Sequence, residues 1–131
     1  MAERKTILAI DDNVVVLKVL TNLLSPDFDV LTSTSASSAM VEMDKKQPDL
    51  ILLDIEMPDV SGLEFLHTIR KNPRFIKTPI VVVTGHTDSE LVTRAERSGA
   101  SGIVYKPIDQ EDLLKKITYA FEHPPKSIFG L

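Results

Sequence analysis

Short apolar runs of strand length recur along this chain, and each is followed by a segment whose apolar residues have helical spacing. Continuous apolar runs are typical of strands that are buried on both faces, as they are in parallel sheets. Strands that alternate with helices indicate a parallel sheet with helices on both faces, joined by right-handed crossovers. The runs that we interpret as strands are residues 6–10, 28–32, 50–53, 79–84 and 102–105.

The segments between and after these runs predict five helices, because apolar residues recur in them every three or four positions. Prolines such as Pro26 and Pro124 favour a helix stop. We therefore predict an α/β fold, a doubly wound five-stranded parallel sheet with strand order 2-1-3-4-5. The helical stripes are carried by Leu17, Leu20 and Leu24, then Ala36, Ala39 and Met43, then Leu63, Leu66 and Ile69, then Leu91, Val92 and Ala95, and finally Leu113, Ile117 and Phe121.

The length of 131 residues suits one domain, which we place at residues 1–123, with a short tail or the start of a linker at 124–131. A net charge of −4 disfavours binding to nucleic acid or to an anionic membrane surface. The lack of cysteine excludes disulfides, thiolate metal sites and a cysteine nucleophile, and it favours a cytoplasmic location. Because the apolar runs are short, we expect neither a signal peptide nor a membrane span.

Polar residues stand where the predicted strands end. Asp11 and Asp12 follow the first strand, Asp54 ends the third, Thr84 ends the fourth and Lys106 follows the fifth. In a parallel sheet these ends share one edge, so the five side chains should converge in one shallow pocket. Three neighbouring carboxylates repel one another unless a proton or a cation relieves them. Mg²⁺ prefers oxygen ligands and keeps sites open for a phosphate oxygen, so we expect a magnesium site there.

Each of these residues also has a simpler interpretation. Asp11 and Asp12 could equally be helix N-caps, and Asp54 alone could be a turn residue. A threonine at a strand end is usually only β-branched, and a lysine such as Lys106 is usually only solvated. The occurrence of all five residues at one edge of the predicted sheet favours a functional site.

The three histidines have no partners at metal-ligand spacing. We expect His67 and His123 to be surface residues. His86 follows Thr84 by two positions, so it lies close enough to the predicted pocket to influence its chemistry.

Four motifs together resemble the response-regulator receiver domain of two-component signalling, the family of the small chemotaxis regulator. The resemblance extends from about Lys5 to Phe121. It implies a flavodoxin-like fold and a signalling switch driven by phosphorylation, rather than an enzyme with a separate substrate. The motifs are Asp11-Asp12, the segment 54–62 (DIEMPDVSG), Thr84-Gly85 and Tyr105-Lys106-Pro107.

The resemblance implies that Asp54 is the phosphoacceptor and that the protein assists its own phosphorylation and dephosphorylation. It further implies that Asp12 and Asp54 bind Mg²⁺ directly, that Asp11 acts partly through water, and that the main-chain carbonyl of Glu56 is a further ligand. The implied phosphoryl donor is a histidine kinase or a phosphotransfer protein.

The resemblance also implies that Thr84 and Lys106 contact the phosphoryl oxygens and that the bond before Pro107 is cis. Thr84 then moves inward and Tyr105 follows, which changes a face built from the fourth helix, fifth strand and fifth helix. A downstream protein would bind that face, and a phosphorylation-dependent dimer is a further expectation. We expect Glu56 and His86, at the mouth of the pocket, to set the phosphoryl lifetime.

Two other functions share parts of this pattern. A phosphatase of the haloacid-dehalogenase type also forms an aspartyl-phosphate, but such enzymes normally carry Asp two residues after the nucleophile, where this chain has Glu56. A flavodoxin-like cofactor binder would need a Ser-, Thr- or Gly-rich phosphate loop after the first strand. Here that loop is acidic, with Asp11 and Asp12, and would repel a phosphate in the absence of metal.

Overall fold

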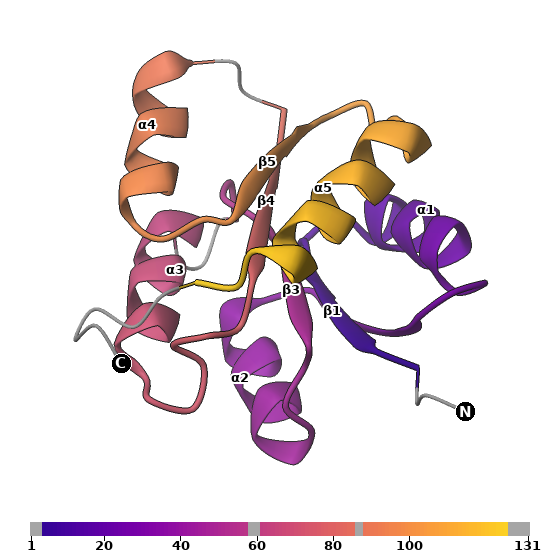
Figure 1. Ribbon diagram of the computed structural model, residues 1–131, viewed down its shortest axis with the longest axis horizontal. Coiled ribbons are helices and arrows are strands. Elements are labelled where there is room, and N and C mark those ends of the chain that lie inside the picture. The colour runs from indigo at the N-terminus through magenta and orange to yellow at the C-terminus, as the bar shows by residue number, and fades with distance from the viewer. Residues whose placement is uncertain (1–3, 58–60, 86–87, 126–131) are drawn as a thin grey trace.

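The computed structural model describes residues 4–57, 61–85 and 88–125. They form one parallel sheet with the strand order β2-β1-β3-β4-β5, which confirms the predicted topology (Figure 1). Two strands begin a residue later than predicted, one at Asp29, which is in register with Thr6 of its neighbour, and one at Ile80. The strands are β1 (Thr6–Ile10), β2 (Asp29–Ser33), β3 (Leu50–Asp54), β4 (Ile80–Thr84) and β5 (Gly102–Tyr105).

Five helices alternate with the strands, as predicted: α1 (Val14–Leu24), α2 (Ala36–Lys45), α3 (Gly62–Lys71), α4 (Ser89–Arg97) and α5 (Gln110–Glu122). The N-cap of α1 is Asn13, whose Oδ1 accepts a hydrogen bond from the amide of Val15 at 2.9 Å. The alternative that Asp11 or Asp12 caps this helix is therefore wrong. None of the helices described is long and apolar enough to span a membrane.

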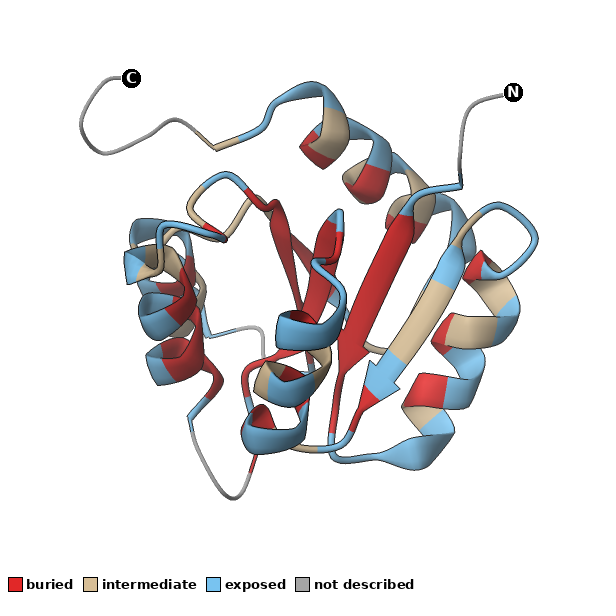
Figure 2. Cartoon of the chain, turned by 90° about the horizontal axis from the view of Figure 1, so that it is seen from below, coloured by how far each residue is buried: buried red, intermediate tan, exposed pale blue. Residues whose placement is uncertain are grey.

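Two apolar cores lie on the two faces of the sheet. Alternate residues of the strands, such as Ile7 and Leu8 in β1, enter opposite cores. Helices α1 and α5 cover one face, and α2, α3 and α4 cover the other. Every residue of β1, β3 and β4 is buried, and Figure 2 shows the helices turning their buried sides toward the sheet. Burial from both sides explains why the apolar runs in the sequence are continuous.

The start of α3 packs directly against the segment that follows β3. The amide of Gly62 donates to the carbonyl of Ile55 at 3.2 Å. A Cβ at Gly62 would overlap the Cα of Ile55 and lie 2.6 Å from the carbonyl oxygen of Asp54. Only glycine permits this close approach, which fixes the backbone just after the carboxyl end of β3.

Candidate functional site

Three carboxylates meet at the carboxyl edge of the sheet. Asp11 follows β1 directly, and Asp54 is the last residue of β3. Oxygen atoms of Asp11, Asp12 and Asp54 all lie within 4.8 Å of one another. Asp11 and Asp54 are buried, with 1% and 2% of their surface exposed, whereas Asp12 is exposed. The site is thus open to solvent on the side of Asp12.

The surroundings of Asp54 disfavour the charged form of its carboxylate and so raise its pKa. Burial raises its pKa from 3.8 to about 6, even though the amide of Glu56 donates to Asp54 Oδ1 at 3.0 Å and lowers it. The carboxylate of Asp11 adds to the rise, the ammonium of Lys106 opposes it, and the Glu56 carboxylate adds a smaller rise. The hydrogen bond and the single cation therefore do not compensate for desolvation and like charge.

Lys106 is the cation of the site. Its Nζ lies 2.9 Å from Asp11 Oδ2 and 3.8 Å from Asp54 Oδ2. Partial burial lowers the pKa of this ammonium, but the hydrogen bond to Asp11 and the neighbouring carboxylates raise it by more, so the net shift is upward. The peptide bond between Lys106 and Pro107 is cis. Among the residues that the structure describes, Lys106 thus pairs with Asp11 and Asp54, and Asp12 lies next to these two carboxylates.

Thr84 and Tyr105 lie side by side at the ends of β4 and β5, where they are register partners. The Thr84 side chain is fully buried, and its Oγ1 donates to Glu56 Oε1 at 3.2 Å. Its main-chain carbonyl accepts from the amide of Lys106 at 2.8 Å. Tyr105 is 41% exposed, so its ring points away from the core. The hydrogen bond between Thr84 and the Glu56 side chain had no counterpart in the sequence analysis.

The residues present fit a hard divalent cation. Their donors are carboxylate oxygens, which Mg²⁺ prefers, and burial together with the Asp11 carboxylate raises the pKa of Asp54, so its charged form is disfavoured. A cation bound between Asp11, Asp12 and Asp54 would stabilise that charged form. The arrangement therefore combines a buried carboxylate, a nearby ammonium and three carboxylates that could bind a metal ion.

The remaining candidates from the sequence lie elsewhere or are not described. His67 is exposed on α3. His123 is exposed after α5, where its Nδ1 is 2.9 Å from the carbonyl oxygen of Tyr119 and its ring stacks on that tyrosine at 4.0 Å. His86 and the motif residues 58–60 fall outside the described residues.

Comparison with known proteins gives a consistent family. The family described as "Response regulator receiver domain" matches residues 7–118. The CAI-1 autoinducer sensor kinase/phosphatase CqsS of Vibrio cholerae is 32% identical over 115 residues, which are 86% of this chain and 17% of that protein. The nitrate/nitrite response regulator protein NarL of Escherichia coli is 36% identical over 121 residues, 90% of this chain and 55% of that protein. This chain thus spans about a sixth of the first relative and about half of the second.

A solved structure, that of the chemotaxis protein CheY4 of Vibrio cholerae, superposes with a TM-score of 0.83 at 28% identity. The superposition covers 88% of this chain and 98% of that one. The match therefore extends over nearly the whole fold described above.

Proposed function

Because this chain belongs to the response-regulator receiver family of two-component systems, we propose that it is a phosphorylation-dependent switch whose phosphoacceptor is Asp54. The observation that carries the proposal is the buried Asp54 carboxylate, with a pKa raised to about 6, beside the Lys106 ammonium. Such a group is a nucleophile that needs additional positive charge before an anionic donor can approach.

In the proposed step, an oxygen of Asp54 attacks the phosphorus of a phosphohistidine on a histidine kinase or a phosphotransfer protein. The O–P bond forms as the N–P bond breaks, and the imidazole nitrogen leaves with the electron pair. Lys106 Nζ, 3.8 Å from Asp54 Oδ2, is placed to offset charge on the phosphoryl oxygens. Asp11 holds that ammonium in position at 2.9 Å. The chain is thus a phosphoacceptor that assists its own phosphorylation and dephosphorylation.

The residues that would hold Mg²⁺ are Asp11, Asp12 and Asp54, with the main-chain carbonyl of Glu56 as a further ligand. The clustering of the three carboxylates within 4.8 Å supports this set. When bound, the ion supplies positive charge that lets the carboxylates and a phosphoryl group share one pocket. Lys106 is not a metal ligand, because it is a cation. Its ammonium pairs with two of the same carboxylates, those of Asp11 and Asp54.

Thr84 and Tyr105 form the proposed switch. A phosphoryl group on Asp54 would offer the Thr84 hydroxyl a more strongly charged acceptor than Glu56 Oε1, its partner at 3.2 Å. The hydroxyl turns inward, and the outward ring of Tyr105 follows into the space beside it. Tyr105 and Lys116 line one hollow between α4 and α5, so this movement reshapes the α4-β5-α5 face to which a downstream protein binds.

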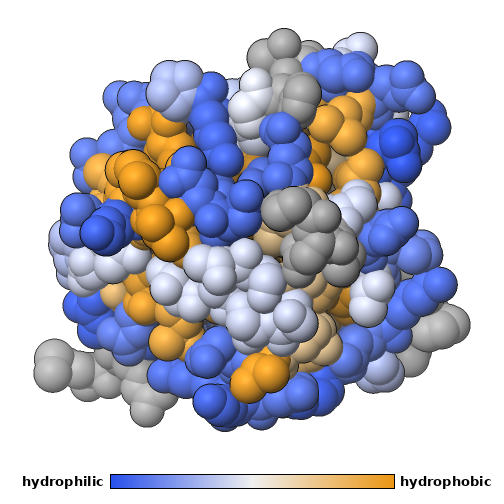
Figure 3. Space-filling view, turned by 180° about the vertical axis from the view of Figure 1, so that it is seen from behind, coloured by the Kyte–Doolittle hydropathy of each residue, from blue (hydrophilic) through white to orange (hydrophobic). Residues whose placement is uncertain are grey.

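The phosphoryl donor needs a docking surface next to Asp54, and α1 supplies a suitable one. A hollow lined by Val15, Lys106 and Ile108 joins the valines of α1 to the site. Figure 3 shows apolar patches on a surface that is otherwise largely hydrophilic. Exposed apolar groups beside a reactive centre favour the docking of another protein. The exposed valines are Val14, Val15 and Val19, at 55%, 64% and 41%.

The wider setting is also part of the proposal. One relative is named a sensor kinase/phosphatase and another a response regulator, which supports a kinase as the donor. The absence of cysteine supports a cytoplasmic location. A phosphorylation-dependent dimer would use the same movement of Tyr105. The acidic net charge of −4 argues against direct contact with nucleic acid or anionic membranes.

Phosphorylation by a small donor tests the proposal. We expect acetyl phosphate to label the wild-type chain in Mg²⁺ and to leave it unlabelled in a chelator, as judged by intact-mass spectra. Asp54→Asn should remain unlabelled, while the matched variant Asp49→Asn, at a carboxylate on the other edge of the sheet that binds the amide of Thr6, should be labelled normally. Equal labelling of Asp54→Asn would refute the assignment.

The haloacid-dehalogenase alternative makes a different prediction for the same samples. Such an enzyme would release inorganic phosphate from a small phosphate ester over many turnovers. In the receiver proposal, a small phosphate ester releases no phosphate, and acetyl phosphate releases it only at the slow rate at which the acyl phosphate on Asp54 hydrolyses.

A further inference from the structure

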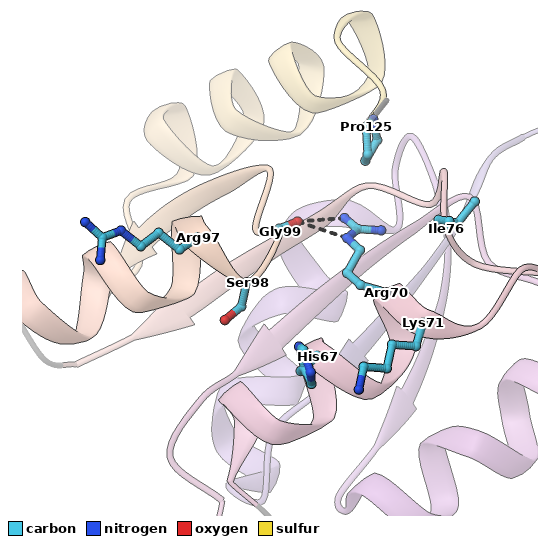
Figure 4. A pocket seen from close by; sticks show the side chains of 8 residues that line it. All are labelled: His67, Arg70, Lys71, Ile76, Arg97, Ser98, Gly99 and Pro125. Atoms are coloured by element: carbon cyan, nitrogen blue, oxygen red, sulfur yellow. Dashed lines mark hydrogen bonds between the residues drawn. The ribbon is translucent and has the colours of Figure 1, made fainter. Parts of the chain in front are cut away.

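A cavity of about 340 Å³ lies between the C-terminal ends of α3 and α4 (Figure 4). Its central side chain, Arg70, bonds to the carbonyls of Thr78 and Gly99, which precede β4 and β5. These carbonyls therefore lie at the amino ends of the strands, at the edge of the sheet opposite to Asp54. The cavity is thus separate from the proposed phosphorylation site.

The N–H groups of Arg70 are largely used within the fold. Its Nε and Nη2 donate to the carbonyl of Gly99 at 3.0 and 2.9 Å, and its Nη1 donates to the carbonyls of Phe75 at 3.2 Å and Thr78 at 2.6 Å. These bonds use four of the five N–H groups, all of which lie in the plane of the guanidinium. An occupant of the cavity would therefore meet the flat face of Arg70 or its aliphatic stem. Both surfaces pack well on an aromatic ring.

The rest of the lining is mainly hydrocarbon. Ile76 and the ring of Pro125 are half-buried walls of the cavity, and Gly99 adds no side chain to it. Figure 4 shows that the charged ends of Lys71 and Arg97 point away from the cavity, which they line with their aliphatic stems. A cavity with such walls favours an apolar occupant, because filling it removes hydrocarbon surface from water.

The chain itself brings an apolar segment to this cavity. After α5 the chain runs toward α3 (Figure 1), and Pro125, the last residue that the structure describes, lines the cavity. The next six residues have the sequence KSIFGL, in which Ile128, Phe129 and Leu131 are apolar. Phe129 follows Pro125 by four residues, and an extended chain spans about 13 Å over that length, so its ring can reach the walls.

We propose that the segment 126–131 docks in this cavity, with the ring of Phe129 between Ile76 and the face of Arg70. A phenylalanine ring contributes a large apolar area, which offsets the entropy lost when a few residues become ordered. Because Pro125 tethers the segment beside the cavity, docking has the advantage of a high effective concentration over the binding of a separate peptide. The proposal does not depend on phosphorylation of Asp54.

NMR spectra of the full chain test the proposal. We expect nuclear Overhauser effects between the ring protons of Phe129 and the methyl groups of Ile76, and ring-current shifts at the amides of Ser98 and Gly99. Phe129→Ser should abolish these shifts, while Ser127→Ala, two positions earlier in the same segment, should keep them. A Phe129 ring with the signals of an unfolded chain and no contact to Ile76 would overturn the proposal.

Two isoleucines provide a matched control for proteolysis. Ile76 and Ile108 are both half-buried, but Ile108 lines the hollow beside Lys106 at the carboxyl edge. Because proteolysis follows the population of the undocked segment, Ile76→Ser should speed chymotrypsin cleavage after Phe129 about tenfold, and Ile108→Ser should not. The rate is taken relative to cleavage after Tyr119, inside α5, which reports unfolding of the whole domain. Equal rates in the two variants would refute docking at this cavity.

A second copy of the chain is the other occupant to exclude. In a mixture of isotope-labelled and unlabelled protein, the contact between Phe129 and Ile76 should be found within one copy only. The ring-current shift at Gly99 should also be independent of protein concentration. A contact between labelled and unlabelled copies, or a shift that disappears on dilution, would show exchange of the segment between copies and would overturn the intramolecular assignment.

Discussion

Charged side chains are buried at one edge of this sheet and half-buried at the other, and they are compensated differently. At the amino edge, four N–H groups of Arg70 donate to three main-chain carbonyls. At the carboxyl edge, Asp11 and Asp54 are buried beside each other with one ammonium, that of Lys106, between them. The guanidinium is therefore held by the chain itself, whereas the carboxylates need a cation from outside. This difference supports the proposal that metal-dependent chemistry takes place at the carboxyl edge.

The local backbone explains how each edge arises. Gly99 has a φ of 105°, and a Cβ there would lie 2.8 Å from Arg70 Nε, so only glycine lets its carbonyl reach the guanidinium. Asp54 instead ends β3 and accepts one amide hydrogen bond, from Glu56. Main-chain donors at this edge are too few to satisfy two buried carboxylates. The amino edge is consequently a structural feature, and the carboxyl edge is the one for which we propose a reaction.

The largest effect should come from removing the amino-edge cation. Arg70→Ala leaves the carbonyls of Phe75, Thr78 and Gly99 without their donor, and we expect it to lower the free energy of unfolding by about 3 kcal/mol. Urea denaturation measures this loss. The control is Arg74→Ala, whose ion pair with Asp44 is exposed and should cost less than about 1 kcal/mol. Equal losses of unfolding free energy in the two variants would contradict the structural role that we assign to Arg70.

At the carboxyl edge, removal of a charge should raise the free energy of unfolding rather than lower it. Asp54→Asn keeps the acceptor for the Glu56 amide but removes the buried charge, so it should stabilise the metal-free protein near neutral pH by about 2 kcal/mol. Saturating Mg²⁺ should reduce this gain, because the ion binds the wild-type site more tightly than the variant, which lacks one of the three carboxylates. A destabilised Asp54→Asn in chelator would contradict the account of this edge.

The pH dependence of that difference follows from the raised pKa of Asp54. The carboxyl group of Asp54 binds its proton more tightly in the folded chain than in the unfolded chain. The contribution of this proton to the free energy of unfolding is therefore complete below the unfolded pKa of 3.8 and is lost as the pH rises through about 6. Wild type and Asp54→Asn should therefore diverge between these pH values in chelator. Urea midpoints measured across this window would show whether the divergence occurs there.

Replacement of Thr84 should abolish the conformational response to phosphorylation while Asp54 still accepts the phosphoryl group. Thr84→Ala removes the hydroxyl that now donates to Glu56 Oε1, yet it leaves Asp54 and Lys106 unchanged, so we expect phosphorylation to continue. Amide spectra with beryllofluoride, a phosphoryl mimic, should show shifts near Asp54 and none at Tyr105. A wild-type shift at Tyr105 in this variant would exclude the proposed coupling.

The smallest effect concerns the lifetime of the phosphoryl group. Glu56→Ala removes an exposed carboxylate that bonds to Thr84 and flanks the approach to Asp54. We expect the dephosphorylation rate to change about fivefold, equivalent to about 1 kcal/mol at the transition state. Following the decay of the acyl phosphate in both proteins measures it. Glu64→Ala, on the exposed side of α3, is the matched control and should decay as wild type does.

The sequence predicted the carboxyl edge far better than the amino edge. Asp54, Thr84 and Lys106 stand next to apolar runs, and the topology of a parallel sheet alone brings such positions together. Arg70 had no comparable signal, because its partners are main-chain carbonyls and any residue could supply them. Basic residues in the last turn of a helix are also common, since they complement its dipole.

Local details depended on contacts that periodicity does not encode. The cap of α1 is Asn13 rather than either preceding aspartate, because its side chain reaches the amide of Val15. The bond from Thr84 to Glu56 depends on the path of the loop after β3, which Gly62 fixes by close packing. Such features need the folded backbone before they can be assigned.

The titration of Asp54 most directly tests the central claim, that the carboxylates of the carboxyl edge need positive charge in addition to that of Lys106. The carboxyl carbon signal of Asp54 would be followed by NMR against pH, first in chelator and then in saturating Mg²⁺. We predict a midpoint of about 6 in chelator and a clear fall in the presence of Mg²⁺. A midpoint at or below the ordinary 3.8 in the metal-free protein, or one that Mg²⁺ leaves unchanged, would contradict the account.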